Sequence, residues 1–323
     1  MSLILVGDFG QLPPVMDTIL WKKKHEKECL QGFNLYRTFD QHINLSKVMR
    51  QDDPKFLNLL NRIRNGKITE SDWETLKKRN PDILKKLPED YDSILRLFPR
   101  NQTVFNYNIN QLRKLSNKKI PVVKCVADHL GNKKAQNASV KDMWGLHPVV
   151  WLCQQAEVML NQNLLPAIYG LVNGSRVKVI DILFDENTKD MTMPYVVIVD
   201  FPDYKGPQFF KNHPTYVPIP PFTAMNTKRK IPYTRIQIPL NLAFAITIHK
   251  SQGLTLKRAV VDLEKSENSE GGLTYVALSR LKTLDGLFLV QPSWKRLKQI
   301  NDRVMIKKRI KEEKRLRNKC KVR

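Results

Sequence analysis

Three short motifs in this sequence could bind a phosphate-bearing ligand: the first two follow apolar runs, and the third follows Gly271-Gly272. The first is Gly7-Asp-Phe-Gly-Gln-Leu-Pro-Pro14, which follows Leu3–Val6. The second is Thr247-Ile-His-Lys-Ser-Gln-Gly253, at the end of another apolar run, and the third is Tyr275-Val-Ala-Leu-Ser-Arg280. In open α/β sheets ligands bind beyond the carboxyl ends of the strands, so polar turns at these places are well positioned for chemistry.

The first motif joins a flexible backbone to two polar side chains. Gly7 allows a ligand to approach the backbone closely, while Asp8 and Gln11 can hold a phosphate-bound metal ion or a water molecule. The alternative is a purely structural sequence of a strand, a turn and a rigid Pro-Pro exit.

The second motif places many hydrogen-bonding groups in one loop, as a phosphate-rich ligand requires. They are Thr247, His249, Lys250, Ser251 and Gln252, followed by Gly253. A single histidine would more often be structural, but this cluster favours a binding role. In the third motif, Arg280 is either an ordinary surface arginine or one that a turn aims across a cleft at a phosphoryl group.

Apolar patterning predicts the elements that position these motifs. Leu3–Val6 is typical of a buried parallel strand, which needs neighbours on both sides. Asp53 and Pro54 begin a helix whose apolar face is Phe56, Leu59, Leu60 and Ile63, and Gly66 ends it. Further predictions are a helix opened by a capping box at Thr69–Asp72, a buried strand at Ile94–Phe98, and a helix over 102–115 with Phe105, Ile109 and Leu112 on one face.

The pattern changes between about residues 156 and 237. Short β-rich runs, Arg176–Ile180 and Tyr195–Val199, are separated by turns and followed by a proline-rich stretch. This predicts a small antiparallel barrel inserted into the larger fold. From Lys307 to Arg323 there are ten Lys or Arg residues and two Glu, which indicates either a basic helix or a disordered arm.

Composition points to a polyanionic partner. The formal charge is +24 over 323 residues and the isoelectric point is near 9.9, so nucleic acid is the favoured partner. A membrane surface is the competing possibility, but no basic amphipathic helix stands out and no apolar run could span a bilayer. Four scattered cysteines show no metal-ligand spacing, and the first residues do not resemble a signal peptide. We therefore expect an intracellular protein with no metal site of its own and no membrane association.

At these motifs the sequence resembles the PIF-type (petite integration frequency) DNA helicases, relatives of RecD in superfamily 1B. Residues 7–15 resemble that family's motif III, and Met49-Arg50-Gln51-Asp52 resembles motif IV. Residues 247–253 match motif V nearly letter for letter, and residues 275–280 resemble motif VI. The resemblance extends in the right order from residue 3 to about residue 292.

The resemblance implies a RecA-like, P-loop NTPase-type α/β fold in which ATP lies between two lobes. It assigns 1–40 to a remnant of the first lobe, 41–163 and 238–295 to the second, 164–237 to an inserted small β-barrel, and 296–323 to a basic tail. Residues expected to face the nucleotide are Gly7, Asp8, Gln11, Gln252 and Gly253. Gln11 would sense the γ-phosphate, and Arg50 and Arg280 would act as arginine fingers. Residues expected to face single-stranded DNA are Thr247, His249, Lys250 and Ser251.

One departure limits this expectation: the sequence contains no P-loop of the form G-x-x-x-x-G-K-[ST]. Strands ending at Asp200 and Asp262 imitate a metal-binding strand but lack the acidic neighbour. The site for ATP and Mg²⁺ is therefore expected to be incomplete, with a truncated first lobe. The expected function is the C-terminal part of an ATP-dependent 5′-to-3′ DNA helicase, in the nucleus or in mitochondria. The alternatives are a non-catalytic nucleic-acid-binding protein and a subunit that donates arginines in trans.

Overall fold

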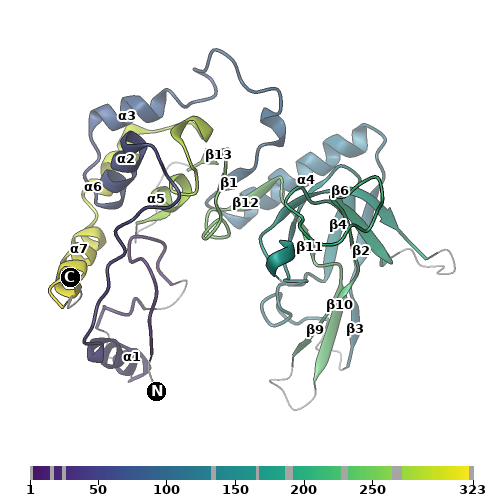
Figure 1. Ribbon diagram of the computed structural model, residues 1–323, viewed down its shortest axis with the longest axis horizontal. Coiled ribbons are helices and arrows are strands. Elements are labelled where there is room, and N and C mark those ends of the chain that lie inside the picture. Colours follow the sequence, from purple (N-terminus) through teal and green to yellow (C-terminus); the bar gives the residue numbers. More distant parts are fainter. Residues whose placement is uncertain are drawn as a thin grey trace. The chain divides into compact units, whose positions relative to one another are not determined.

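The computed structural model describes residues 3–14, 18–23, 27–131, 136–164, 167–185, 192–226, 232–263 and 271–319. Within it the chain forms two compact units (Figure 1). Unit 1 comprises residues 1–101 and 247–323, and unit 2 comprises residues 102–246. The fold is mixed α/β, with a parallel sheet in unit 1 and antiparallel sheets in unit 2.

The parallel sheet has the strand order β12-β1-β13-β14, and β12 lies where the chain passes from unit 2 into unit 1. β13 pairs in parallel with β1 on one side and with β14 on the other. The strands are β1 (Arg96–Phe98), β12 (Ala245–Thr247), β13 (Ala259–Asp262) and β14 (Leu287–Val290). The helices are α1 (Lys27–Thr38), α2 (Pro54–Arg64), α3 (Glu70–Lys77), α5 (Leu273–Leu278), α6 (Trp294–Asn301) and α7 (Val304–Arg317). The predicted buried strand at Ile94–Phe98 is thus confirmed, with shorter bounds.

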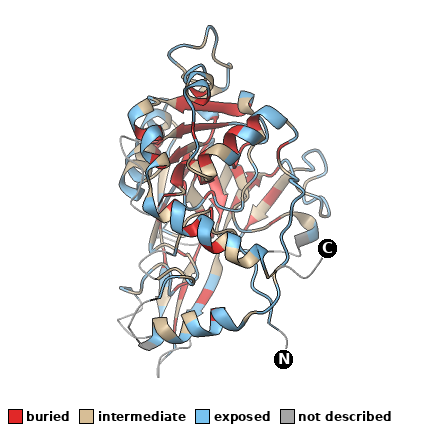
Figure 2. Ribbon diagram, turned by 90° about the vertical axis from the view of Figure 1, so that its left-hand side faces the viewer, coloured by how far each residue is buried: buried red, intermediate tan, exposed pale blue. Residues whose placement is uncertain are grey.

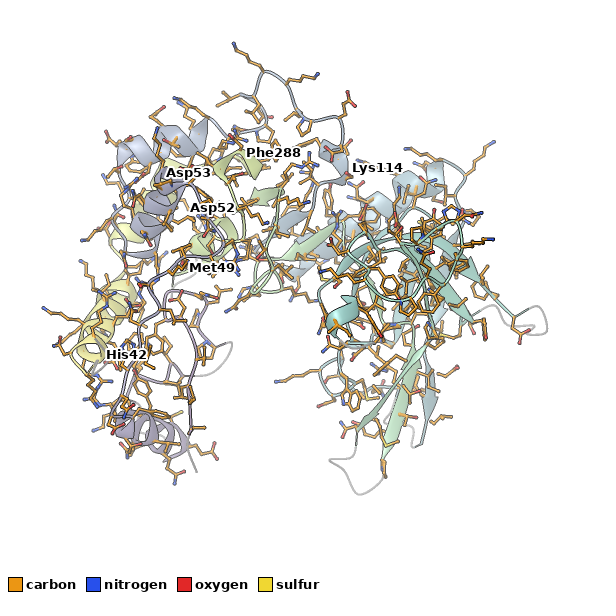
Figure 3. All side chains as sticks on the ribbon, viewed as in Figure 1. His42, Met49, Asp52, Asp53, Lys114 and Phe288 are labelled. Atoms are coloured by element: carbon orange, nitrogen blue, oxygen red, sulfur yellow. The ribbon has the colours of Figure 1, made fainter. Side chains whose placement is uncertain are left out.

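The helices α2 and α3 begin as their sequences predict. The side chain of Asp53 accepts a hydrogen bond from the amide of Lys55 at the start of α2 (Figure 3). Thr69 and Asp72 form a reciprocal capping box at the start of α3. Phe56, Leu59, Leu60 and Ile63 are all buried, so the four predicted apolar positions of α2 face the core.

The prediction of a buried strand at Leu3–Val6 is wrong. These residues have no regular secondary structure, and Val6 is 90% exposed. No strand among the residues that the structure describes pairs with them, and all four side chains are at least half exposed. Regular packing begins only at Asp8. Met49 is likewise exposed, Arg50 is half-buried, and the side chain of Gln51 is buried.

Unit 2 is built from antiparallel strands. A five-stranded sheet has the order β11-β5-β6-β7-β8, a three-stranded sheet the order β3-β10-β9, and β2 pairs with β4. The strands are β2 (Val122–Val126), β3 (Asp128–Leu130), β4 (Val149–Cys153), β5 (Glu157–Leu160), β6 (Arg176–Leu183), β7 (Val196–Asp200), β8 (Tyr216–Ile219), β9 (Phe222–Asn226), β10 (Tyr233–Gln237) and β11 (Leu240–Leu242).

The two β-rich runs predicted from the sequence are confirmed as β6 and β7, which pair with each other. Unit 2 extends beyond the residues 164–237 of the predicted insertion, because it also includes most of helix α4 (Asn101–Asn117) and the strands β2 to β5. Closure of these sheets into a barrel stays a prediction.

The helix α4 (Asn101–Asn117) differs from its predicted inner face. Leu112 is buried as expected, but Phe105 is 58% exposed and Asn108 is buried in its place. The Asn108 side chain accepts a hydrogen bond from the amide of Ala245 at 2.8 Å and donates to the Ala245 carbonyl at 3.1 Å. The buried backbone amide and carbonyl of Ala245 need hydrogen-bonding partners, and this need favours the face of α4 that carries Asn108.

The C-terminal region is helical and packed. Of the two forms left open for residues 307–323, the helix is correct as far as residue 317, and residues 320–323 lie outside the described part. Ile306, Arg309 and Glu312 are buried, and buried positions alternate with exposed ones along the helices (Figure 2). No helix among the described residues is both long and apolar enough to cross a membrane.

Candidate functional site

The turn at Asp8–Gln11 is shaped by the Asp8 carboxylate. Asp8 Oδ1 accepts a hydrogen bond from the amide of Gly10 at 2.8 Å, and the Asp8 carbonyl accepts one from the amide of Gln11 at 3.1 Å. An aspartate that bonds its own downstream backbone in this way stabilises a tight turn. The turn fixes the direction in which the Gln11 side chain leaves the backbone.

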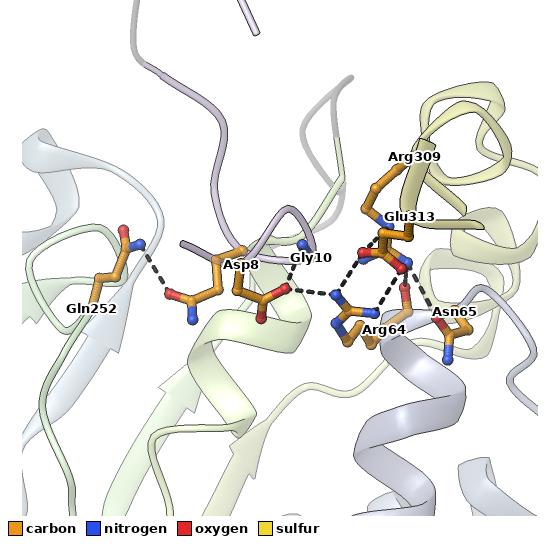
Figure 4. Close-up of polar contacts among 8 residues, drawn as sticks. Asp8, Gly10, Arg64, Asn65, Gln252, Arg309 and Glu313 are labelled. Atoms are coloured by element: carbon orange, nitrogen blue, oxygen red, sulfur yellow. Dashed lines mark hydrogen bonds and ion pairs between the residues drawn. The ribbon is translucent and has the colours of Figure 1, made fainter. Parts of the chain in front are cut away.

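Charged residues of two helices hold this turn (Figure 4). Arg64, in the last turn of α2, lies 2.6 Å from Asp8 Oδ1 and 2.6 Å from Glu313 Oε1 of α7. Arg309 of α7 donates to the Arg64 carbonyl at 2.5 Å and lies 3.7 Å from Glu313. One guanidinium thus bridges a carboxylate of the turn and a carboxylate of α7, a geometry that arginine's planar fork allows.

This network sets the ionisation of Asp8. Burial alone would raise the pKa of Asp8, but the hydrogen bond and charge of Arg64 and the Gly10 amide outweigh it. The pKa of Asp8 therefore lies below its usual value of 3.8. Burial also lowers the pKa of Arg309, helped by the charge of Arg64. Asp8 is therefore an anion surrounded by cations at neutral pH.

The turn packs closely against the start of α5. Gly272 has φ of +88°, and a Cβ atom there would lie 2.9 Å from the carbonyl oxygen of Gln11. Only glycine combines that backbone conformation with so close an approach. Between the turn, α2, α5 and α7 lies a pocket of about 170 Å³, whose polar lining residues include Asp8, Arg64, Thr274, Tyr275 and Arg309.

Gln11 is joined directly to the second motif. Gln252 Nε2 donates a hydrogen bond to Gln11 Oε1 at 2.9 Å (Figure 4). The two residues are 241 positions apart in the sequence, and both belong to unit 1. The structure therefore brings together two of the residues that the family resemblance assigns to a nucleotide. Gly7 is exposed, and Gly253 has φ of +89° with open space around it.

The second motif divides into buried and exposed residues. Thr247 and Ser251 are buried, and their hydroxyl groups bond within the turn: Thr247 Oγ1 accepts from the Lys250 amide, and Ser251 Oγ donates to the Ile248 carbonyl. His249 and Lys250 are exposed, as are Gln252 and Gly253. Thr247 and Ser251 therefore shape the loop, whereas the exposed His249 and Lys250 are available to a ligand.

Arg50 and Arg280 converge on the same turn after α5. Arg50 donates through Nε to Thr255 Oγ1 at 3.0 Å and through a terminal nitrogen to the Ser279 carbonyl at 3.1 Å. The neighbouring Gln51 donates to the Ser279 and Leu281 carbonyls and so fixes this segment to the turn. Arg280 donates to the Val276 carbonyl at 3.0 Å and to Ser279 Oγ at 2.9 Å.

The electrostatics of this pair favour an anion. Burial and the charge of Arg50 lower the pKa of Arg280 to about 10. Neither guanidinium has an ion-pair partner in the described part of the chain. Two arginines that repel each other and have no carboxylate between them form a site that gains stability from a phosphate group.

Sequence reasoning missed Arg64, Arg309 and Glu313. These residues come from the end of α2 and from α7, and no local spacing relates them to Asp8. The available signal was that residues 307–323 contain only two acidic residues among ten basic ones. The strands ending at Asp200 and Asp262 are β7 and β13, and no group of three or more possible metal ligands occurs among the described residues.

Comparison with known proteins agrees with these motifs. No protein-family model matches the sequence. The ATP-dependent DNA helicase Pif1 of Bdellovibrio bacteriovorus is 31% identical over 292 residues, which cover 90% of this chain and 58% of that protein. The crystal structure of Pif1 helicase from Candida albicans superposes with a TM-score of 0.69 at 27% identity, covering 95% of this chain and 67% of that one.

A third protein, Pif1 helicase from Bacteroides, shares the fold at 24% identity. Its crystal structure in complex with ADP-AlF3 and ssDNA has a TM-score of 0.58 and covers 90% of this chain and 64% of that one. The chain spans between 40% and 58% of the length of the first three curated relatives that it matches, all of them PIF1 helicases. By its motifs, its relatives and its fold, the chain belongs to the PIF1-type DNA helicases.

Proposed function

We propose that this chain forms part of an ATP-dependent 5′-to-3′ DNA helicase, in which it binds single-stranded DNA and supplies arginines to the ATP site. The hydrogen bond between Gln11 and Gln252 is the main support for this proposal. It links the turn expected to sense the γ-phosphate to the loop that also presents His249 and Lys250. A change at the nucleotide would thus reach the DNA-facing loop through one side-chain contact.

Arg50 and Arg280 are the proposed arginine fingers. Both are anchored to the turn after α5, and both have guanidinium groups without a carboxylate partner among the described residues. Such groups suit the phosphate end of ATP, where they would stabilise the charge that develops on the transferring phosphoryl group. The described residues include no group of three or more possible ligands for Mg²⁺, and the sequence has no P-loop. We therefore assign no catalytic step to a metal ion or to a P-loop in this chain.

For DNA, we propose His249 and Lys250 as the residues that contact the backbone, with Thr247 and Ser251 positioning the loop. The exposure of the first two and the internal hydrogen bonds of the other two support this division. The formal charge of +24 supplies the long-range attraction. The Bacteroides Pif1 structure contains both ADP-AlF3 and ssDNA, which supports the same two ligands for this chain.

The test is to join a P-loop-bearing segment from a related helicase to the N-terminus of this chain and to measure DNA-stimulated ATP hydrolysis. The proposal expects hydrolysis that falls by about a thousandfold or more with Arg280→Ala, given the usual contribution of an arginine finger. The matched control is Arg258→Ala, because Arg258 pairs with Asp90 on the surface of the same unit. Equal activity of the two variants would contradict the arginine-finger assignment.

The absence of a P-loop from the sequence favours a second candidate, a nucleic-acid-binding protein without turnover. Single-stranded DNA binding by the chain, together with a fusion that remains inactive, would support it. We further propose a nuclear or mitochondrial location and a role in DNA repair, recombination or telomere maintenance. Imaging of a fluorescently tagged chain tests the location.

A further inference from the structure

The helix α7 is anchored by its only two acidic residues, and each anchors a different neighbour. Glu312 accepts a hydrogen bond from the Tyr36 hydroxyl of α1 at 2.7 Å and pairs with Arg315. Glu313 pairs with Arg64, which in turn holds Asp8. The inner face of α7 thus reaches the turn that orients Gln11 through the Arg64 guanidinium, and Arg309 of the same helix donates to the Arg64 carbonyl beside it.

The outer face of α7 has the opposite character. Its exposed charged side chains are Lys307, Lys308, Lys311, Lys314 and Arg317. None of them has an ion-pair partner in the described ranges. Lys307, Lys311 and Lys314 recur at intervals of four and three residues, so they follow one another along one side of the helix over roughly 10 Å. Like charges at these spacings repel, and an unpartnered row of them is stabilised by a polyanion.

We propose that α7 couples nucleic-acid binding to the Asp8 turn: its outer lysines bind a sugar-phosphate backbone, and Glu313 transmits the event through Arg64. The inference rests on the proposed function for the identity of the polyanion. It adds a second contact surface, separate from the loop at 247–253, and it makes Glu313 a positioning residue for Gln11.

Nucleic acid fits this surface better than a membrane does. A helix that lies on a lipid bilayer needs a continuous apolar face to insert. On α7 Ile306 is buried against unit 1, and the exposed apolar side chains are only Val304 and Ile310. The free face is therefore almost wholly cationic, as a backbone-binding surface is.

The first experiment measures binding of the full chain to fluorescent dT30 as a function of salt. Replacing Lys307, Lys311 and Lys314 by Gln should lower the slope of log K against log salt by about 2, because each phosphate that a lysine neutralises on a single strand adds about 0.7 to the slope. The matched control replaces the exposed Lys55, Lys77 and Lys78, in α2 and at the end of α3, by Gln, with the same change in charge. Equal slopes for the two triple variants would overturn the proposal. Preference of the wild-type chain for vesicles with anionic lipid over dT30 would overturn it as well.

The second experiment measures hydrogen exchange of the Gly10 amide, which is bonded to Asp8, with and without dT30. In the wild-type chain dT30 should change its exchange rate severalfold, and in Glu313→Gln this response should fall below twofold. Glu312→Gln, one residue away on the same helix, controls for general loosening of α7 and should retain the response. An equal response in Glu313→Gln and wild type, or an equally weakened response in both variants, would refute the route through Arg64.

The two experiments also separate this inference from the proposed function. If the wild-type chain does not bind dT30 at all, the proposed function fails. If it binds dT30 normally but the α7 triple variant binds like its control, only the role of α7 fails.

Discussion

Gly272 and Gly253 share a backbone conformation and differ in what surrounds them. Their φ angles are +88° and +89°, but a Cβ atom at Gly272 would meet the Gln11 carbonyl at 2.9 Å, whereas at Gly253 it would meet nothing within 4 Å. Both Gly→Ala variants should lose about 1 kcal/mol from the left-handed conformation alone. Gly272→Ala should lose at least about 1 kcal/mol more, because the turn must move.

Urea unfolding of the two variants measures the difference in their free energies of unfolding. The NMR signals of the Gln11 side-chain amide report whether its contact with Gln252 persists. Equal stabilities would mean that the turn adjusts freely to a methyl group at position 272.

The Asp8 carboxylate makes stability depend on pH. Since its pKa is lower in the folded protein than the usual 3.8, its contribution is fully present above that value and is lost as pH falls through the folded-state pKa. Asp8→Asn should therefore cost about 1.5–2 kcal/mol at pH 7, a typical value for charge-assisted hydrogen bonds. The difference in the free energy of unfolding between Asp8→Asn and wild type should decrease as the pH falls below 4.

Unfolding at a series of pH values provides the measurement. Asp285→Asn is the control, because Asp285 pairs with Arg79 at the surface and should change stability little at any pH. If the difference in the free energy of unfolding between Asp8→Asn and wild type stays constant down to pH 3, Arg64 does not stabilise the ionised Asp8 carboxylate.

At the scale of elements, caps and apolar spacing in the sequence were sufficient to predict helices α2 and α3 but not to predict the buried face of α4. The caps of α2 and α3 act within a few residues, so sequence alone contains the information. The orientation of α4 depends on Ala245, more than a hundred residues away, whose backbone amide and carbonyl both bond to Asn108. Long-range pairing of this kind leaves no local pattern.

Asn108→Ala should destabilise unit 2 by about 2–3 kcal/mol, because it leaves the buried backbone groups of Ala245 without partners. Phe105→Ala on the same helix should change the stability by no more than about 0.5 kcal/mol, as expected of an exposed position. Thermal unfolding of both variants tests this. A greater loss of stability for Phe105→Ala than for Asn108→Ala would mean that the inner face of α4 is the one predicted from the apolar spacing.

At the scale of the whole molecule, we expect the 323-residue chain alone to hydrolyse no ATP. Arginines stabilise the transferring phosphoryl group only when the nucleotide is already held in place, and the sequence has no P-loop to hold it. Phosphate release with and without dT30 is the measurement. DNA-stimulated hydrolysis that disappears with Arg280→Ala would contradict this expectation.

The same chain should bind single strands with little sequence preference and a steep dependence on salt. Contacts to the phosphate backbone dominate such binding, because the released counterions are the same for every sequence. Fluorescence anisotropy with dT30 and with a mixed-sequence 30-mer, between 50 and 200 mM salt, compares the two. A tenfold preference for one oligonucleotide at every salt concentration would indicate readout of the bases instead.

The sequence by itself determined what depends on neighbouring residues: the caps of α2 and α3, the presence of strands at β6 and β7, and the motifs that identify the family. The family resemblance also implied that Gln11 and Gln252 serve one ligand, and this stays a prediction. Only the tertiary structure decided that Leu3–Val6 is exposed and that α7 is packed rather than loose. It also decided that Arg64 joins Asp8 to Glu313. These features depend on partners distant in the chain, and the energy of an apolar run or a charged side chain is set by whether such a partner is present.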